Sequence, residues 1–154
     1  MDVKRFLDEK SVSYTVLPHQ WSRGAAAVAS AVHTQPGHVA KPVLLHADHS
    51  YCDLVAIVPA NAAIDFEKVS RMMGGADIQL ATEQDVSDRC PDCERGVLPP
   101  FGSQYGMQTL VDESLAEQET IVIEGNCRTE AVQLLWEDFR RLENPLVGEF
   151  AIRK

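Results

Sequence analysis

The feature that most constrains this fold is a segment in the middle of the chain that suits neither helix nor strand. Residues Cys90–Gly102 read Cys-Pro-Asp-Cys-Glu-Arg-Gly-Val-Leu-Pro-Pro-Phe-Gly and hold three prolines and two glycines. Proline lacks a backbone N–H and restricts φ, and both residue types favour turns, so regular structure stops here. Loops of this length are uncommon inside a small domain and tend to carry function. We therefore expect short elements on either side of a long functional loop.

The rest of the sequence predicts short helices and strands in irregular alternation. Helices are expected at Val3–Lys10, at Arg23–His33, from an Asp65 N-cap to Met73, and from a Thr82/Asp85 capping box to Arg89. Strands are expected at Ser13–Leu17, Val39–Ala47, Tyr51–Pro59, Ile78–Ala81, Thr109–Val111 and Thr120–Glu124. The second and third of these strands form a hairpin around Asp48-His49-Ser50.

The order of these elements favours one fold class. Ala131–Leu135 fits a buried strand or the start of a helix that ends at Leu142, so both readings stay open. The chain shows no strict βαβ rhythm, no GxGxxG motif and no GxxxxGK[ST] motif. A single α+β domain over residues 1–154, with a mixed sheet, fits best.

Charge and hydropathy limit the partners. The 14 Lys and Arg residues stand against 23 Asp and Glu residues, a net charge of −9. Wrapping of DNA or RNA is disfavoured because phosphate neutralisation needs a basic surface, although contact with one end of a nucleic acid needs few cations. No apolar run approaches the ~18 residues that span a bilayer, and the first residues contain no apolar leader. We expect a cytoplasmic protein that binds neither DNA nor a membrane.

The cysteines and histidines give no metal site. Cys52, Cys90, Cys93 and Cys127 are expected to be reduced thiols in a cytoplasmic chain. The lone Cys90-x-x-Cys93 pair lacks the second pair of a zinc site, and it closes a helix instead of opening one as a redox motif does. The five histidines show no ligand spacing. Two ordinary loop cysteines are the simpler interpretation.

Lys41 is the most informative single charge. It stands at the start of the apolar run Val39–Leu45, and Pro42 favours an extended backbone there. Its ammonium group is either a fixed cation in a pocket or a charge that protects the edge of a sheet. Spacing alone favours the edge role.

Taken together, several motifs resemble the YbaK/prolyl-tRNA-synthetase-associated family of aminoacyl-tRNA deacylases. They are the Ala-rich segment Ala27–Val32, Lys41 before an apolar strand, Val55–Pro59, Leu80-Ala81-Thr82-Glu83, the loop Gly96-Val97-Leu98-Pro99-Pro100-Phe101-Gly102, Gly125 and Asp138-Phe139. The resemblance covers roughly residues 3–150, and its most specific part is the GxxPPFG loop at this distance from the lysine.

The resemblance implies a fold, an activity and a site. It implies a compact α+β domain with a mixed, barrel-like sheet flanked by helices, Ala131–Leu134 as a strand and a last helix over Trp136–Leu142. It implies a trans-editing hydrolase that cleaves the ester of mischarged aminoacyl-tRNA without a metal or cofactor. The implied partners are the acceptor end of aminoacyl-tRNA and, as a candidate, an aminoacyl-tRNA synthetase.

The family site maps onto particular residues of this sequence. Lys41 and Gly102 are the implied catalytic residues. The implied substrate-binding residues are Gly96, Val97, Pro99, Pro100, Phe101, Gly125, Asn126 and Cys127. An aminoacyl ester is already activated, so a positioned ammonium and close backbone N–H groups suit its hydrolysis by water or by a substrate group. Four cations form a candidate basic rim or are simply solvated: Arg23, Lys41, Arg95 and Arg128.

One departure from the family pattern keeps other functions open. Many relatives carry a histidine shortly after the glycine that matches Gly125, whereas this chain has Asn126-Cys127-Arg128. The amino acid that is removed is therefore not defined by the sequence. The alternatives are a catalytically silent module of this family that binds a nucleotide or small molecule, and a thiol redox protein based on the CxxC pair.

Overall fold

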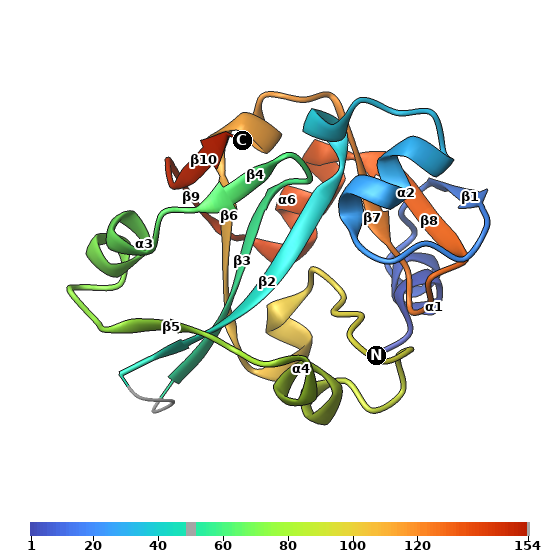
Figure 1. The fold of residues 1–154 in the computed structure, drawn as a ribbon. Coiled ribbons are helices and arrows are strands. Elements are labelled where there is room, and N and C mark those ends of the chain that lie inside the picture. Colours follow the sequence, from blue (N-terminus) through green and yellow to red (C-terminus); the bar gives the residue numbers. More distant parts are fainter. Residues whose placement is uncertain (49–51, 154) are drawn as a thin grey trace.

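The computed structural model describes residues 1–48 and 52–153, in which helices and strands alternate irregularly (Figure 1). The helices are α1 (Val3–Glu9), α2 (Ala25–Ala31), α3 (Phe66–Met72), α4 (Glu83–Arg89), α5 (Glu113–Ala116) and α6 (Trp136–Glu143). The strands are β1 (Tyr14–Pro18), β2 (Ala40–Ala47), β3 (Cys52–Pro59), β4 (Ala62–Ile64), β5 (Ile78–Leu80), β6 (Gln108–Asp112), β7 (Thr120–Glu124), β8 (Glu130–Leu135), β9 (Leu146–Gly148) and β10 (Ala151–Arg153). The expected α+β class is confirmed.

The strands belong to three sheets. The largest has the order β5-β2-β3-β6-β9, the second β1-β8-β7, and the third pairs β10 with β4. The largest sheet is mixed, because β2 pairs antiparallel with β3 whereas β6 runs parallel to both β3 and β9. An isolated parallel bridge between Val39 and Val122 brings the start of β2 beside β7. The described strands do not close into a barrel.

Local sequence signals place several element ends correctly. The Asp65 carboxylate accepts hydrogen bonds from the backbone N–H groups of Glu67 and Lys68, as an N-cap does. Thr82 and Asp85 form the reciprocal capping box at the start of α4. The hairpin is confirmed from Ala40 opposite Pro59 to Ala47 opposite Cys52. His49 and Ser50 of the predicted turn, and Tyr51 at the start of the predicted second strand, lie outside the described part of the chain.

The ambiguous segment after Gly125 is a strand. β8 pairs antiparallel with β1 on one side and with β7 on the other, which places it at the centre of its sheet. Helix α6 begins directly afterwards at Trp136, as the family resemblance implied. The sequence analysis missed the short elements α5, β4, β9 and β10, because three or four residues carry little periodicity and form structure only through distant partners.

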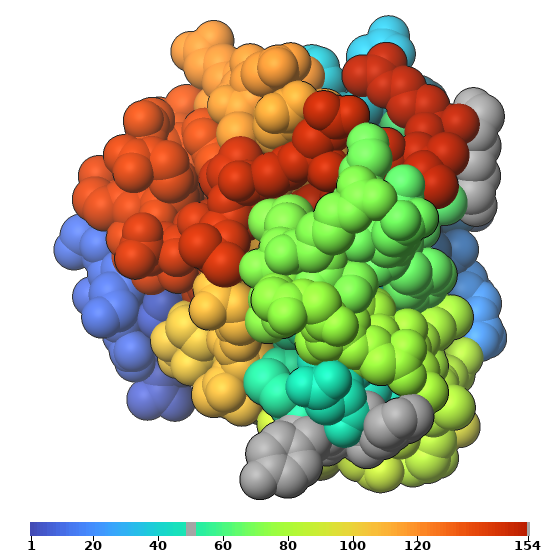
Figure 2. Space-filling model, turned by 90° about the vertical axis from the view of Figure 1, so that its left-hand side faces the viewer, coloured from blue at the N-terminus to red at the C-terminus, as the bar shows by residue number. Residues whose placement is uncertain are grey.

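Two apolar cores lie on opposite sides of β2. Alternate residues of a strand point to opposite faces, and Ala40 and Leu44 belong to the core that contains Phe101. Leu45 and Ala47 belong to a second core with Val69 of α3. Figure 2 shows the outer side of this second region, where the C-terminal segment (red) lies against the β4–α3 segment (green), in agreement with the β4–β10 pairing. Among the described residues, no helix is long and apolar enough to cross a membrane.

A charged cluster ties the hairpin to α4. His46 of β2 contacts the carboxylates of Asp53 at 2.7 Å and Asp85 at 3.1 Å, and Arg89 donates to Asp53. The hydrogen bonds to Asp53 and then Asp85 raise the pKa of His46. Burial alone would raise the pKa of Asp53, but the bonds from His46 and Arg89 outweigh it and lower it. The backbone bond from Thr82, followed by the His46 contact, lowers the pKa of Asp85 to about 2.

The cluster predicts a pH-dependent stability. The pKa of His46 is raised in the folded state, so protonated His46 adds to the free energy of unfolding. This contribution is fully present at pH values below the unfolded pKa of about 6.5, and it is lost as the pH rises through the folded pKa. Denaturant unfolding of wild type and His46→Gln should therefore give a stability difference that shrinks from pH 6 to pH 8.5. Substitution of the exposed His33 by Asn is the control and should give a flat difference. A His46→Gln difference that is constant over this range would contradict the assignment.

Candidate active site

The candidate site lies where β2 and β7 diverge after a single bridge between Val39 and Val122. Val39 and Val122 are bridged, and both belong to the buried cluster with Ala25 and Val28, so their side chains face α2. Residues two positions further along each strand point to the same side. By this alternation, Lys41 is the next residue after Val39 on that side of β2, and Glu124 is the next residue after Val122 on that side of β7. The parting of the two strands thus carries one cation and one carboxyl group.

Lys41 lies in a small apolar pocket. The pocket has a volume of about 250 Å³ and its other walls are Val43, Ala63, Ile64, Phe66 and Leu80. The Lys41 Nζ donates to the carbonyl oxygen of Ala62, and the side chain is half-buried. None of these walls belongs to the 96–102 loop. Lys41 and Phe101 also face opposite sides of β2, so they do not share a pocket wall.

The Pro- and Gly-rich segment has no helix or strand from Cys90 to Phe101, as predicted, but it is packed inside the protein. Residues 97–102 are all buried, and only Gly96 of this loop is half-exposed. Leu98 and Phe101 are part of the main core. Of the expected loop contacts, Val97, Pro99, Pro100 and Phe101 therefore have side chains that shape the protein interior.

Gly102 is held by its neighbours. Its N–H donates to the hydroxyl of Thr109 at 3.1 Å, and the buried carboxylate of Glu143 accepts from Thr109 and from Ser103. A Cβ at Gly102 would lie 2.5 Å from the Thr109 hydroxyl and 3.2 Å from the Met107 carbonyl oxygen. Its φ is not in the left-handed region. Glycine is needed here for space, and its N–H already has a partner.

The structure does bring Gly96 and the 125–128 segment together. Gly96 has a φ of +81°, and a Cβ there would meet the guanidinium of Arg128 at 2.6 Å. Glu94 N–H donates to the carbonyl of Asn126, and the Glu94 carboxylate accepts from the N–H of Arg128. These contacts fix the exposed end of the predicted substrate loop against the segment that begins at the buried Gly125.

Within that segment, the expected substrate residues have different roles. The Asn126 side chain accepts from Val3 N–H and donates to the Met1 carbonyl, so it holds the N-terminus. The Cys127 thiol contacts the Thr129 hydroxyl at 3.3 Å and lies near Lys4. Glu124, which the sequence analysis did not select, is only 8% exposed and precedes Gly125 directly.

The four cations do not form one rim. Arg23 and Arg95 both form ion pairs with Glu83. Arg128 is buried, donates to the Arg95 carbonyl at 2.9 Å and lies over the Trp21 ring. Lys41 lies in the separate pocket described above. Three arginines thus gather beside Gly96, but they are largely neutralised by acidic partners.

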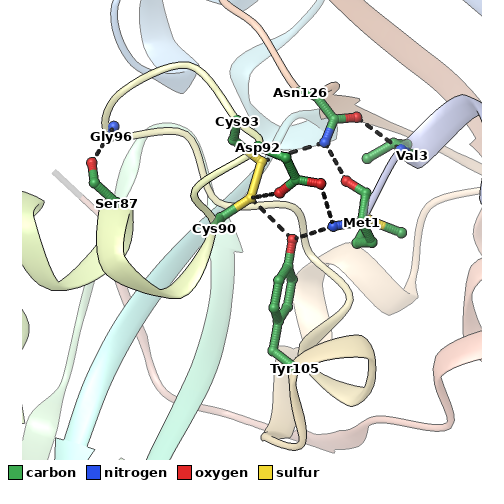
Figure 3. Close-up of a disulfide and its surroundings, with 9 residues drawn as sticks. All are labelled: Met1, Val3, Ser87, Cys90, Asp92, Cys93, Gly96, Tyr105 and Asn126. Atoms are coloured by element: carbon green, nitrogen blue, oxygen red, sulfur yellow. Dashed lines mark hydrogen bonds and ion pairs between the residues drawn. A yellow bond between two sulfur atoms is a disulfide. The ribbon is translucent and has the colours of Figure 1, made fainter.

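The expectation of reduced thiols is wrong for Cys90 and Cys93, which form a disulfide (Figure 3). The turn after α4 brings their Cα atoms to 5.5 Å, within the range that a disulfide bridges. The N-terminal ammonium of Met1 donates to Asp92 and Tyr105, and burial raises the pKa of Tyr105 to about 12. Although Cys90, Asp92 and Cys93 cluster closely enough for a metal ion, the bridged sulfurs carry no thiolate.

Comparison with known proteins shows the family of this chain. Residues 19–142 match the family model of the aminoacyl-tRNA editing domain, and the chain therefore belongs to that family. It is 23% identical to the Enterococcus faecalis protein named "Putative Cys-tRNA(Pro)/Cys-tRNA(Cys) deacylase EbsC" over 96% of this chain and 88% of that protein.

Two solved structures share the fold. The structure described as "a putative trans-editing enzyme for prolyl tRNA synthetase" superposes with a TM-score of 0.79 at 18% identity, covering 97% of this chain and 94% of that one. The hypothetical protein APE2540 gives a TM-score of 0.86 at 13% identity, covering 97% and 99%. The fold expected from the sequence is confirmed by these similarities.

The crowding at Gly102 predicts a structural penalty. Gly102→Ala should lower the free energy of unfolding by about 1–3 kcal/mol, because an added methyl group overpacks a closed site. Gly37→Ala is the matched control, since no atom lies within 4 Å of its Cβ position and its φ is ordinary. Urea unfolding of both variants measures the difference. Equal free energies of unfolding for the two variants would contradict the prediction and show that the residues around Thr109 move to accommodate the added methyl group.

Proposed function

We propose that the protein hydrolyses the ester bond of mischarged aminoacyl-tRNA in trans, with Lys41 holding the reacting end of the substrate and Gly96, the half-exposed end of the 96–102 loop, contacting the acceptor end. The observation that carries the proposal is the placement of Lys41, a cation on a rigid strand in an apolar pocket, within a chain of the editing family. A tRNA substrate places the proposed reaction in the cytoplasm, and the synthetase that mischarges the tRNA is the partner candidate.

The proposed roles follow from chemistry. The Lys41 ammonium is suited to hold the ester carbonyl, a ribose hydroxyl or the terminal phosphate, because contacts to charged groups are the strong ones. The rigid loop lowers the ordering cost of binding, since its prolines and its buried side chains limit its conformations. Because an aminoacyl ester is already activated, positioning and electrostatic stabilisation supply much of the acceleration. Water or a substrate group is the nucleophile.

The acidic surface is compatible with such a substrate. Reading only the terminal adenosine and the amino acid requires few phosphate contacts, so a net charge of −9 is tolerable. Cys127, in the segment where this chain departs from the family pattern, lies beside Lys4 and Thr129 and is not one of the walls of the Lys41 pocket. This placement favours an active hydrolase over a silent binding module.

The test is a panel of mischarged tRNAs that carry small amino acids, incubated with the purified protein while ester loss is followed. Cys-tRNA(Pro) is the first substrate to include, since the related E. faecalis protein is named for it. We expect faster loss than in buffer for at least one mischarged species and little loss for correct pairs. Loss no faster than in buffer across the whole panel would refute the proposal.

Removing the Lys41 cation should abolish most of the activity. Lys41→Ala is expected to slow hydrolysis by about 10²–10³, the cost of one transition-state contact. Lys41→Arg should also be slow, because a guanidinium group is larger and directs its donors differently. Lys68→Ala is the matched control, since this lysine of α3 forms its ion pair with the exposed Glu149 on the surface. Circular dichroism confirms folding, and a near-wild-type rate for Lys41→Ala would disprove the role.

The disulfide should not take part in the reaction. A variant with Cys90→Ser and Cys93→Ser is expected to keep its hydrolytic rate within about twofold, because bridged sulfurs offer no thiolate nucleophile. The same assay measures this, with wild type under a reducing agent as the comparison. Loss of hydrolysis in a folded double variant would instead indicate thiol chemistry.

A further inference from the structure

Glu124 is a buried acid, and among the described residues one of its two carboxyl oxygens has no hydrogen-bonding partner. It ends β7, it is 8% exposed, and its Oε1 atom is buried with no donor within reach among the described residues. Glutamate is almost never buried unless it is paired, because removing a carboxylate from water is costly. Burial accordingly raises the pKa of the Glu124 carboxyl group. Such a group is stabilised by any cation that reaches it.

The neighbouring cations do not satisfy this acid. Arg128, and the His19 ring when it is protonated, attract Glu124 electrostatically, and Glu94 repels it. The Arg128 guanidinium, however, donates to the Arg95 carbonyl and lies over the ring of Trp21. Its Nε atom lies 3.9 Å from the Glu94 carboxylate. Arg128 is therefore committed to holding the loop beside Gly96, and it lowers the cost of the buried acid without bonding to it.

His19 supplies a second unpartnered atom in the same place. Its backbone N–H donates to the Thr129 carbonyl, which fixes it beside the 125–129 segment. Its Nδ1 lies 2.6 Å from the Gln20 carbonyl oxygen, and a carbonyl can only accept, so Nδ1 carries the proton. In the neutral ring, Nε2 is then an acceptor, and it too is buried without a partner among the described residues. Two acceptors, one of them anionic, thus occur together.

We infer that Glu124, with His19, forms the subsite for the α-ammonium group of the aminoacyl ester. A primary ammonium has three N–H donors and one positive charge, and this matches a carboxylate and an imidazole nitrogen. The inference rests on the proposed function and defines its substrate more narrowly. Aminoacyl-tRNA with a free amino group is accepted, and N-acylated aminoacyl-tRNA and peptidyl-tRNA are rejected because they lack the cation.

The position of Glu124 relative to Lys41 supports this orientation. Lys41 and Glu124 each lie two positions beyond one residue of the Val39–Val122 bridge, so strand alternation puts their side chains on the same side as the bridged valines. An ammonium on Lys41 repels the substrate ammonium, whereas Glu124 attracts it. The amino end of the ester is therefore directed to the β7 side and the nucleoside end to the β2 side.

The experiment compares one mischarged tRNA with the same tRNA after N-acetylation of its amino acid. Wild type should hydrolyse the acetylated substrate at least tenfold more slowly in kcat/KM. Glu124→Gln should lose a similar factor on the free-amine substrate, and it should treat the two substrates alike. The matched control is Glu119→Gln, an exposed glutamate just before β7, which should behave like wild type.

The outcomes separate the inference from the function. Hydrolysis of both substrates at equal rates by wild type would overturn the subsite and leave the deacylase proposal standing. A Glu124→Gln variant that slows both substrates equally would make Glu124 a general base or a structural group and would also overturn it. If wild type hydrolyses neither substrate, the subsite is tested by binding instead: calorimetry measures the affinity of the protein for an adenosine analogue that carries an amide-linked amino acid. Binding at least tenfold tighter than that of its N-acetyl form supports the subsite, and equal binding refutes it.

Discussion

The packing of Phe101 is the contact on which the position of the 96–102 loop depends. Its ring is fully buried, and its centroid lies 5.2 Å from the ring centroid of Phe6 in α1 and 5.3 Å from that of Phe139 in α6. A loop rich in proline and glycine has few backbone hydrogen bonds to hold it, so side chains must do so. Glu143 adds to this by accepting bonds from Ser103 and Thr109. With its far end fixed in the core, the loop can deliver Gly96 to Arg128 in one position.

Local signals in the sequence were sufficient wherever neighbours along the chain decide the structure. The Asp65 cap, the Thr82–Asp85 capping box and the β2–β3 hairpin all depend on residues close in sequence, and all were predicted. The segment 131–135 could not be decided locally, since only its pairing with β1 and β7 makes it a strand. Short edge strands such as β9 and β10 were missed for the same reason.

The site was harder to predict than the fold, because charge partners come from distant segments. The three arginines of the expected rim are engaged with Glu83, Glu94 and a backbone carbonyl, and no spacing in the sequence reveals that. The bridge between Cys90 and Cys93 follows from a turn geometry that composition does not define. Glu124 did leave one sign: a lone acid closes the apolar run Thr120–Glu124 directly before a glycine. An acid in a strand that is buried along its length needs either a partner or a function.

The proposed reaction needs orientation more than it needs a strong nucleophile. An aminoacyl ester carries a cation one carbon away from the reacting carbonyl, so opposite charges at two fixed points can set its direction. Strands hold side chains more rigidly than loops do, and both Lys41 and Glu124 stand on strands. The reversed pose would place the substrate ammonium beside Lys41 and leave Glu124 unpaired, so both charges oppose it. A pair of opposite charges at the parting of β2 and β7 would therefore select one pose and, with it, a substrate that has a free amino group.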